Sequence, residues 1–291
     1  MKNSSLPYLK CVRCVQKLQL EILIKNSEIN EGFLLCKKCK LTFPIIQKIP
    51  ILWDDFEAYI KNRPKLGGEL LLSAKTKTMK SFLKDSLSKS KKPREDKSKI
   101  EQRWSSIYQK SNKSKFYQII STAIKKLKPQ KFVLEHGCSI GIISNNISKN
   151  NELIFGIDRS FYAIKIAKQN QNKNCDYFVA DSQYHPFGNQ KFDLILCLNM
   201  LELLEPRNFL KMLSKQISKG TLVLSDPYDF DRGKNSVKNP IDSTQLRNIL
   251  KGYNFQISTS TKKPSYIPWN LTINPRTKLQ YKVDLVIGNK K

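Results

Sequence analysis

Long apolar runs are absent from the sequence, and acidic residues and arginine are scarce. No run approaches the ~20 residues that cross a bilayer, so we do not expect an integral membrane protein. The first ten residues lack the apolar stretch of a secretory signal. The 52 Lys and Arg against 24 Asp and Glu give a net charge of +28, but only nine of the basic residues are arginine. Arginine binds phosphates and bases better than lysine does, so this lysine excess indicates either an anionic partner or coding bias.

The cysteines are odd in number, which argues against a framework of disulfides. Seven are present, and four of them form two tight pairs, Cys11 with Cys14 and Cys36 with Cys39. This usage favours metal binding and a cytoplasmic, reducing location. The chain has 291 residues, 40% of them apolar, which is enough for one large domain or two smaller ones, each with a core.

Composition divides the chain into three predicted regions. Residues 1–60 contain the cysteine pairs and short apolar runs. A basic linker is predicted over residues 61–100, because residues 61–131 carry 21 Lys and Arg against 5 Asp and Glu, a charge of +16. Ser73–Lys99 is rich in Ser and Lys and has few large apolar residues, which favours a solvated tether with a frayed helix over a dedicated RNA-binding arm. Residues 101–291 form the third region.

The third region alternates between strand-like and helix-like segments. Seven short apolar runs have the length of buried strands: Phe132–Leu134, Leu153–Ile157, Tyr177–Val179, Leu194–Leu198, Leu222–Leu224, Phe255–Ile257 and Val283–Ile287. Stretches with apolar residues at helical spacing, such as Phe161–Lys168 and Arg207–Ile217, separate most of them. This order predicts an α/β fold with a mostly parallel, doubly wound sheet of seven strands and helices on both faces.

The two cysteine pairs predict a structural zinc site. Cys11 and Cys14 are separated by two residues, as are Cys36 and Cys39, and 21 residues lie between the pairs. Two residues between cysteines allow a tight turn to aim both sulfurs at one ion, and two such turns complete a tetrahedron. Four thiolates leave no open position, so we expect structural rather than catalytic Zn²⁺.

The segment Leu41–Leu52 follows the second pair and contains Phe-Pro-Ile-Ile and Ile-Pro-Ile. With the cysteines, it resembles the zinc-ribbon family that forms the activating subunit of several tRNA, rRNA and protein methyltransferases. The resemblance covers about residues 8–53. It implies a structural or substrate-presenting domain rather than a reaction centre.

A ligand site is predicted where three of the strands end. The strand in Phe132–Gly141 ends at Glu135 and is followed by Gly137 and Gly141, where glycine lets the backbone approach a ligand. Asp158 ends the next strand and is suited to accept hydrogen bonds from ribose hydroxyls. Asp181 ends the third strand, where its carboxylate is suited to an adenine amine.

These three acidic strand ends make the sequence similar to the class I S-adenosylmethionine (SAM)-dependent methyltransferases, and most similar to those acting on small molecules. The likeness runs from about Lys131 to the C-terminus. It implies that the cofactor SAM is held by eight residues: Glu135, Gly137, Cys138 and Gly141 at the methionine part, Asp158 at the ribose, Asp181 and Ser182 at the adenine, and Asn199 at the methionine end. The third glycine that relatives have is replaced by Ser139-Ile140, so we expect a stiffer loop. A nicotinamide-dependent dehydrogenase is disfavoured, because the loop is not G-x-G-x-x-G.

Candidates for the acceptor side follow the fourth and fifth strands or lie in loops nearby. Asp226 and Tyr228 offer a carboxylate and a phenol, although Asp226 is equally suited to capping a turn. His185 is a candidate base, although a lone histidine is more often structural. Trp269 and Arg276 lie in a segment that either closes as a lid over a flat or anionic substrate or packs as a surface loop.

These features support one leading hypothesis and two alternatives. The leading one is a cytoplasmic SAM-dependent methyltransferase with a zinc ribbon, acting on a small-molecule acceptor. The first alternative is an rRNA or tRNA methyltransferase that holds RNA with the ribbon and the basic linker. The second is a non-catalytic module in which SAM only sets a conformation. The sequence does not define the oligomeric state.

Overall fold

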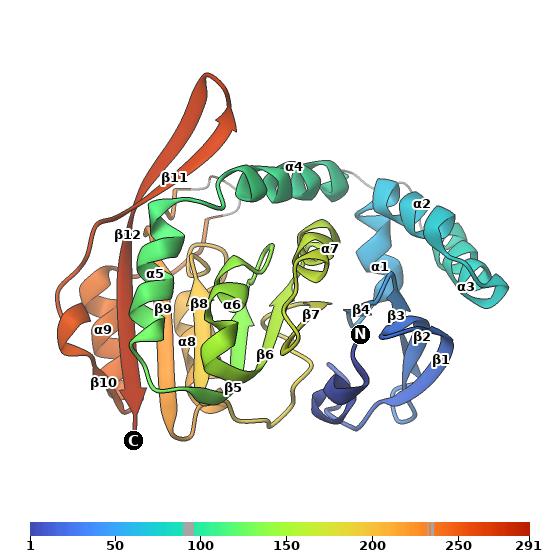
Figure 1. Cartoon of the computed structure of the whole chain (residues 1–291), viewed down its shortest axis with the longest axis horizontal. Coiled ribbons are helices and arrows are strands. Elements are labelled where there is room, and N and C mark those ends of the chain that lie inside the picture. Colours follow the sequence, from blue (N-terminus) through green and yellow to red (C-terminus); the bar gives the residue numbers. More distant parts are fainter. Residues whose placement is uncertain (90–95, 232, 234–235) are drawn as a thin grey trace.

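The computed structural model describes residues 1–89, 96–231, 233 and 236–291. One large mixed sheet runs through the molecule, with helices packed against it (Figure 1). Among the described residues, no helix combines the length and the apolar character needed to cross a membrane.

The central part of the sheet has the predicted seven strands. They lie in the order β7 (Cys175–Ala180), β6 (Asn151–Asp158), β5 (Gln130–His136), β8 (Leu194–Leu198), β9 (Gly220–Asp226), β12 (Thr277–Lys290) and β10 (Phe255–Ile257). The first five pair in parallel, whereas β12 is antiparallel to β9 and to β10. The predicted fold class, an α/β fold with a mostly parallel sheet, is therefore confirmed.

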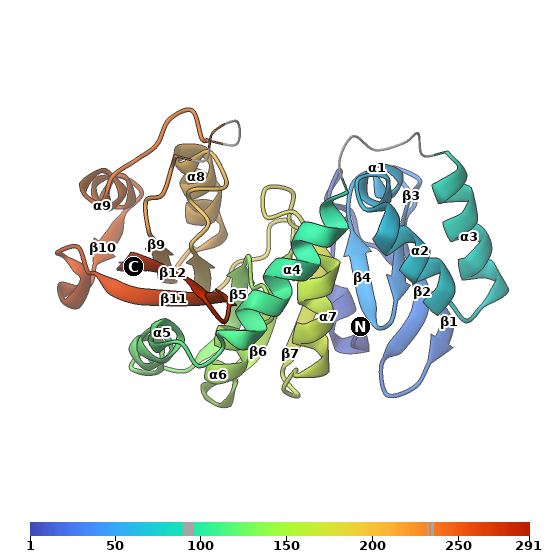
Figure 2. The ribbon, with the colours of Figure 1, turned by 90° about the horizontal axis from the view of Figure 1, so that it is seen from above.

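Helices cover both faces of the central strands, as Figure 2 shows from above. One face carries α5 (Lys115–Lys125), α6 (Ile142–Ile147) and α7 (Phe161–Gln169), and the other carries α8 (Pro206–Gln216) and α9 (Ser243–Gly252). Short 3₁₀ helices also occur: η1 (Asn3–Tyr8), η2 (Ser148–Asn150) and η4 (Thr259–Thr261).

Strand β8 shows why the apolar runs of the central strands do not alternate between apolar and polar residues. Its residues Leu194 and Leu196 point into one hydrophobic core, whereas Ile195 and Cys197 point into the other. Because side chains alternate along a strand, a strand covered on both faces has no polar side.

The N-terminal region extends the same sheet. Strands β1 (Gln19–Lys25), β2 (Ile29–Cys36), β3 (Leu41–Ile46) and β4 (Ile49–Leu52) form an antiparallel meander. The last of these pairs in parallel with β7, with Ile51 opposite Val179 and Leu52 opposite Ala180. The cysteine-containing region is therefore joined to the central strands by main-chain pairing.

The region predicted to be a basic linker forms helices in the structure and is not a solvated tether. After α1 (Phe56–Lys61), the chain forms α2 (Pro64–Ser73) and α3 (Lys77–Ser88), and α4 (Lys97–Lys110) follows residues 90–95, which lie outside the described residues. The few apolar residues recur at four-residue spacing, so Leu66 and Leu70, then Met79 and Leu83, are buried on one side of each helix. The helical spacing of these few apolar residues is therefore enough to bury them. The tether prediction relied on their low number and did not use their spacing.

The last two strands form a hairpin that rises past the edge of the sheet (Figure 1). Strand β11 (Ile267–Asn274) pairs antiparallel with the first half of β12, with Trp269 opposite Tyr281. The backbone N–H of Thr272 donates to the hydroxyl of Ser111 at 3.0 Å, which ties the hairpin to the end of α4.

A buried ion cluster joins the N-terminal region to α7 and β7. The ammonium of Lys168 lies 2.9 Å from Glu28 and also pairs with Asp176, whose side chain is fully buried. Burial raises the pKa of Asp176, but the Lys168 ammonium, the N-terminal amino group and the Ser5 hydroxyl together outweigh burial, so the net pKa lies below the ordinary value.

Removing one member of this cluster leaves a buried charge without its partner. We expect Lys168→Met to lower the free energy of unfolding by about 3–5 kcal/mol. Lys65→Met is the matched control, since Lys65 and Glu69 form an exposed pair and its loss costs less than about 1 kcal/mol. Urea unfolding of both variants measures the difference, and equal stabilities would contradict a structural role for the cluster.

Candidate active site

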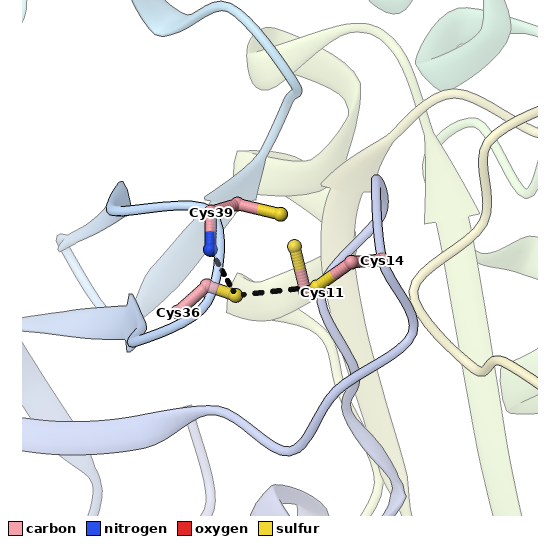
Figure 3. Close-up of side chains that lie close together, drawn as sticks. All are labelled: Cys11, Cys14, Cys36 and Cys39. Carbon is pink, nitrogen blue, oxygen red and sulfur yellow. Dashed lines mark hydrogen bonds between the residues drawn. The ribbon is translucent and has the colours of Figure 1, made fainter.

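The four paired cysteines meet at one point in the N-terminal region (Figure 3). The sulfurs of Cys11, Cys14, Cys36 and Cys39 all lie within 4.8 Å of one another. Four sulfurs bound tetrahedrally to zinc at about 2.3 Å lie about 3.8 Å apart, so the group fits a single zinc ion. Both turns share one geometry, because Val15 and Lys40, the residues that follow each second cysteine, have left-handed φ values of 62° and 56°.

None of these cysteines lines the cavity at the carboxyl ends of the central strands, which is described below. The predicted zinc site is therefore a structural one, and its four thiols fit that role. The two turns contact each other through the sulfurs of Cys14 and Cys36, which lie 3.4 Å apart.

We expect the protein to bind about one zinc ion per chain. Chelation removes the ligand that closes both turns, so we expect residues 1–60 to lose protection from hydrogen exchange. Elemental analysis of Cys36→Ser and of Cys197→Ser provides the comparison, since Cys197 lies in β8 and is not part of the cluster. Equal zinc content in the two variants would refute the site.

A cavity of about 360 Å³ opens at the carboxyl ends of the central strands. Seven of the eight residues predicted to hold the cofactor line it: Glu135, Gly137, Cys138, Asp158, Asp181, Ser182 and Asn199. The eighth, Gly141, lies at the start of α6 with a φ of 73°, and a Cβ there would approach the Tyr177 ring at 2.8 Å. Glycine is thus needed at 141 for the turn and for packing.

The Asp158 carboxylate joins the two loops that border the cavity. The backbone N–H groups of Ser139 and Ser160 donate to its two oxygens at 2.9 and 2.8 Å. Burial raises the pKa of Asp158, and these two donors act in the opposite direction. Ser139, beside this carboxylate, adopts a left-handed φ of 48°, which is costly for a residue with a Cβ.

Glu135 lies deeper in the cavity. Its carboxylate accepts hydrogen bonds from the backbone N–H and the hydroxyl of Ser144, near the start of α6. Burial raises the pKa of Glu135 to about 7, with the Ser144 hydrogen bonds opposing the shift. The group is therefore poised between its charged and neutral forms near neutral pH.

The cavity is also lined by a set of rings that we call the aromatic wall: Trp104, Tyr108, Phe116, Trp269 and Tyr281. Trp269 is at its centre, with ring centroids 6.2 Å from Tyr108, 5.4 Å from Phe116 and 5.5 Å from Tyr281. The rings come from α4, α5, β11 and β12.

Sequence reasoning found only part of the aromatic wall. It placed Trp269 near the acceptor, as one reading of the lid, but did not include Trp104 and Tyr108 among the site residues. Arg276, the other proposed lid residue, is exposed beyond β11 and does not line the cavity. The signal available was the presence of two aromatic residues four apart in α4, which places both on one face.

The three predicted catalytic residues do not line the cavity. Asp226 is buried and accepts hydrogen bonds from the backbone N–H groups of Leu201 and Tyr228. The Tyr228 hydroxyl donates to Asp284 at 2.9 Å, and Asp284 is also paired with Arg247. These contacts are structural, so the turn-capping interpretation of Asp226 fits the structure.

The histidines also lie away from the cavity. The rings of His185 and His136 are 6.0 Å apart, and His185 stacks on Phe187. Burial lowers the pKa of His185 to about 4 and that of His136 to about 3, so both rings are neutral at physiological pH. The structure gives His185 no position from which to act as a base in this cavity.

A buried arginine connects the N-terminal region to the cavity. Arg63 lies over the Tyr59 ring at 4.0 Å and pairs through its Nη2 with Glu101 of α4 at 2.6 Å. Glu101 lines the cavity. The Tyr59 hydroxyl donates to the carbonyl of Arg159, the residue after Asp158, at 3.0 Å.

The seven-stranded sheet, the glycine turn after β5 and the carboxylates that end successive strands define the fold of the class I SAM-dependent methyltransferases. Residues 134–224 match the family described as a methyltransferase domain. A complex between the Haloferax volcanii Trm112 methyltransferase activator and a protein described as a methyltransferase contains a similar fold. Its TM-score is 0.52 at 12% identity, over 65% of this chain and 96% of that chain.

Two curated relatives are similar over the same domain. A ubiquinone biosynthesis O-methyltransferase of Coxiella burnetii is 31% identical over 94 residues, covering 31% of this chain and 40% of the relative. An uncharacterised protein of Methanocaldococcus jannaschii is 34% identical over 101 residues, covering 34% of this chain and 41% of the relative. The chain thus spans about two fifths of the length of these relatives.

Proposed function

We propose that the protein transfers a methyl group from SAM to a small-molecule acceptor, with the cavity as its active site. The observation that carries the proposal is the convergence of three carboxylates from the ends of β5, β6 and β7 on one cavity beside a glycine turn. The methyltransferase domain and the fold support the same conclusion.

In this proposal the cavity residues bind and orient. Asp158 receives the two ribose hydroxyls, Asp181 and Ser182 flank the adenine, and Glu135 with the turn at Gly137 and Cys138 holds the methionine part. Asn199 has a fixed orientation, because the Ser225 hydroxyl donates to its side-chain oxygen at 2.9 Å. When bound, SAM supplies an electrophilic methyl group on a sulfonium, so the protein contributes mainly proximity and alignment.

A small-molecule acceptor is favoured by the shape and lining of the cavity. The aromatic wall closes one side, and its rings offer apolar surface of the kind that lines small-ligand pockets. The RNA alternative relies on exposed lysines such as Lys77, Lys80 and Lys84 on α3, and none of these lines the cavity.

One assay distinguishes the three hypotheses. The protein is incubated with methyl-labelled SAM and a cell extract, with and without RNase. Label in nuclease-resistant small molecules supports the proposal. Loss of label after RNase favours RNA as the acceptor, and the absence of transfer to any fraction favours the non-catalytic module.

Replacing Asp158 tests the cofactor site directly. We expect Asp158→Asn to weaken binding of S-adenosylhomocysteine, the demethylated product of SAM, about 10- to 100-fold, since a hydrogen bond to a charged group contributes about 1.5–3 kcal/mol. Asp54→Asn is the control, because Asp54 forms an exposed pair with Arg13 away from the cavity. Calorimetry gives both Kd values, and a thermal melt checks folding. Unchanged affinity in a folded Asp158→Asn protein would contradict the proposal.

The pH dependence of binding tests Glu135. The ionised carboxylate attracts the amino group of the ligand, and the pKa of Glu135 is about 7. As pH falls below 7 the carboxyl becomes neutral, so affinity for S-adenosylhomocysteine should fall, by at most about 10-fold per pH unit. We expect Glu135→Gln to lose this part of the dependence between pH 5.5 and 8. Identical pH profiles for the wild type and the variant would remove Glu135 from the binding site.

A further inference from the structure

We propose that the acceptor is a planar aromatic amine or nitrogen heterocycle, uncharged or cationic, that lies with its face against the aromatic wall. This inference rests on the proposed methyl transfer and specifies its substrate class. Three features of the cavity support it: the aromatic wall, the sign of the lining charges, and the absence of histidine and lysine from the described lining.

The aromatic wall favours a flat ligand. Trp269 is mostly buried, and its ring is parallel to that of Tyr108 within 5°. Tyr281 lies on the opposing strand of the hairpin and directly opposite Trp269. Because the hairpin is tied to α4 through Thr272 and Ser111, the rings are held together before any ligand binds. Preorganised rings bind a planar aromatic ligand by stacked or edge-on contact.

The cavity charge is opposite to that of the chain. Despite the net charge of +28, the described lining has no lysine and a single arginine, Arg159. Its carboxylates number five: Glu101, Glu135, Asp158, Asp181 and Glu202. One of them, Glu101, is paired with Arg63 behind the wall. The remaining field disfavours an acceptor with a phosphate, sulfonate or carboxylate near its reacting atom and favours N–H groups or positive charge.

Apart from its carboxylates, Glu202 among them, the described lining offers no group suited to take a proton from the acceptor. The lining has neither histidine nor lysine, and burial raises the pKa of Tyr117. Burial raises the pKa of the Glu135 carboxyl to about 7, and this group is assigned to the cofactor. A phenol would have to lose its proton beside these carboxylates, whose negative charge opposes a phenolate. An aromatic amine or a ring nitrogen attacks through its lone pair without losing a proton first.

Methyl transfer to such a nitrogen requires no base from the protein. The nitrogen lone pair forms the new N–C bond to the methyl carbon, and the electron pair of the broken C–S bond remains on sulfur as a neutral thioether. The positive charge passes to nitrogen. An amine then releases one proton to water after the transfer, and a ring nitrogen retains the charge. The cavity carboxylates stabilise the cationic product.

Four probes test the substrate class: 1-naphthylamine, 1-naphthol, 5-aminonaphthalene-1-sulfonate and cyclohexylamine. Transfer from methyl-labelled SAM is measured as kcat/KM for each. We expect 1-naphthylamine to exceed the naphthol and the sulfonate by at least about 10-fold, and cyclohexylamine to accept no label. Equal transfer to the sulfonate or the naphthol, or no transfer to any of the four, would overturn the inference.

Variants of the aromatic wall provide the structural test. We expect Tyr281→Ala to lower kcat/KM for 1-naphthylamine about 10-fold, while the Kd of S-adenosylhomocysteine changes by less than about twofold. Tyr266→Ala is the matched control, since Tyr266 precedes the same hairpin, is exposed and does not line the cavity. Trp104→Leu, in α4, repeats the test if Tyr281→Ala does not fold. Unchanged kcat/KM in both wall variants would overturn the inference. Failure of the wild-type protein to bind S-adenosylhomocysteine would instead refute the proposed function.

Discussion

The parallel pairing of β5, β6 and β7 is the constraint on which the site depends. The register sets Glu135 opposite Gly156 and Asp158 opposite Val179, so successive strands deliver their carboxylates to one edge of the sheet. Carboxylates collected in this way repel one another and lose water, which would be costly without compensating donors. The loops supply them: Ser139 and Ser160 donate to Asp158, and Ser144 donates to Glu135. The glycine turn and the strand ends are therefore one structural unit.

The N-terminal region is built into this unit instead of being attached to it by a tether. Its strand β4 continues the sheet past β7, the strand that precedes Asp181. Lys168 also joins Glu28 of the N-terminal region to Asp176 of β7. On the cavity side, Tyr59 fixes the backbone beside Asp158, and Arg63 fixes Glu101. Disorder in the N-terminal region would thus remove the support of two walls of the cavity, although the four cysteines of that region do not line the cavity.

Local patterns were sufficient to predict the central sheet and the residues at its carboxyl edge. Apolar runs define strands buried on both faces, and the residue that ends each run falls at the same edge in any parallel sheet. The helix α2 and the packing of α3 were not predicted, because only a few apolar residues, among them Leu66 and Met79, mark their buried faces among many lysines. Asp226 and Tyr228 follow the fifth strand as expected, but the turn directs them toward Leu201 and Asp284, a direction that depends on tertiary packing. The aromatic wall was the least predictable part, because it joins residues more than 160 positions apart, such as Tyr108 and Trp269.

The contrast between the charge of the whole chain and the charge of the cavity shows why composition alone misjudges a site. Lysines such as Lys80 and Lys84 point into water, where salt screens them within about 10 Å at ordinary ionic strength. The cavity carboxylates are partly or fully buried, so their field is screened much less and dominates at the reacting atoms. A cationic cofactor and a nitrogen nucleophile that gains positive charge are both suited to that field. The net charge of +28 describes how the surface meets distant partners, and it carries no information about the ligand that the cavity selects.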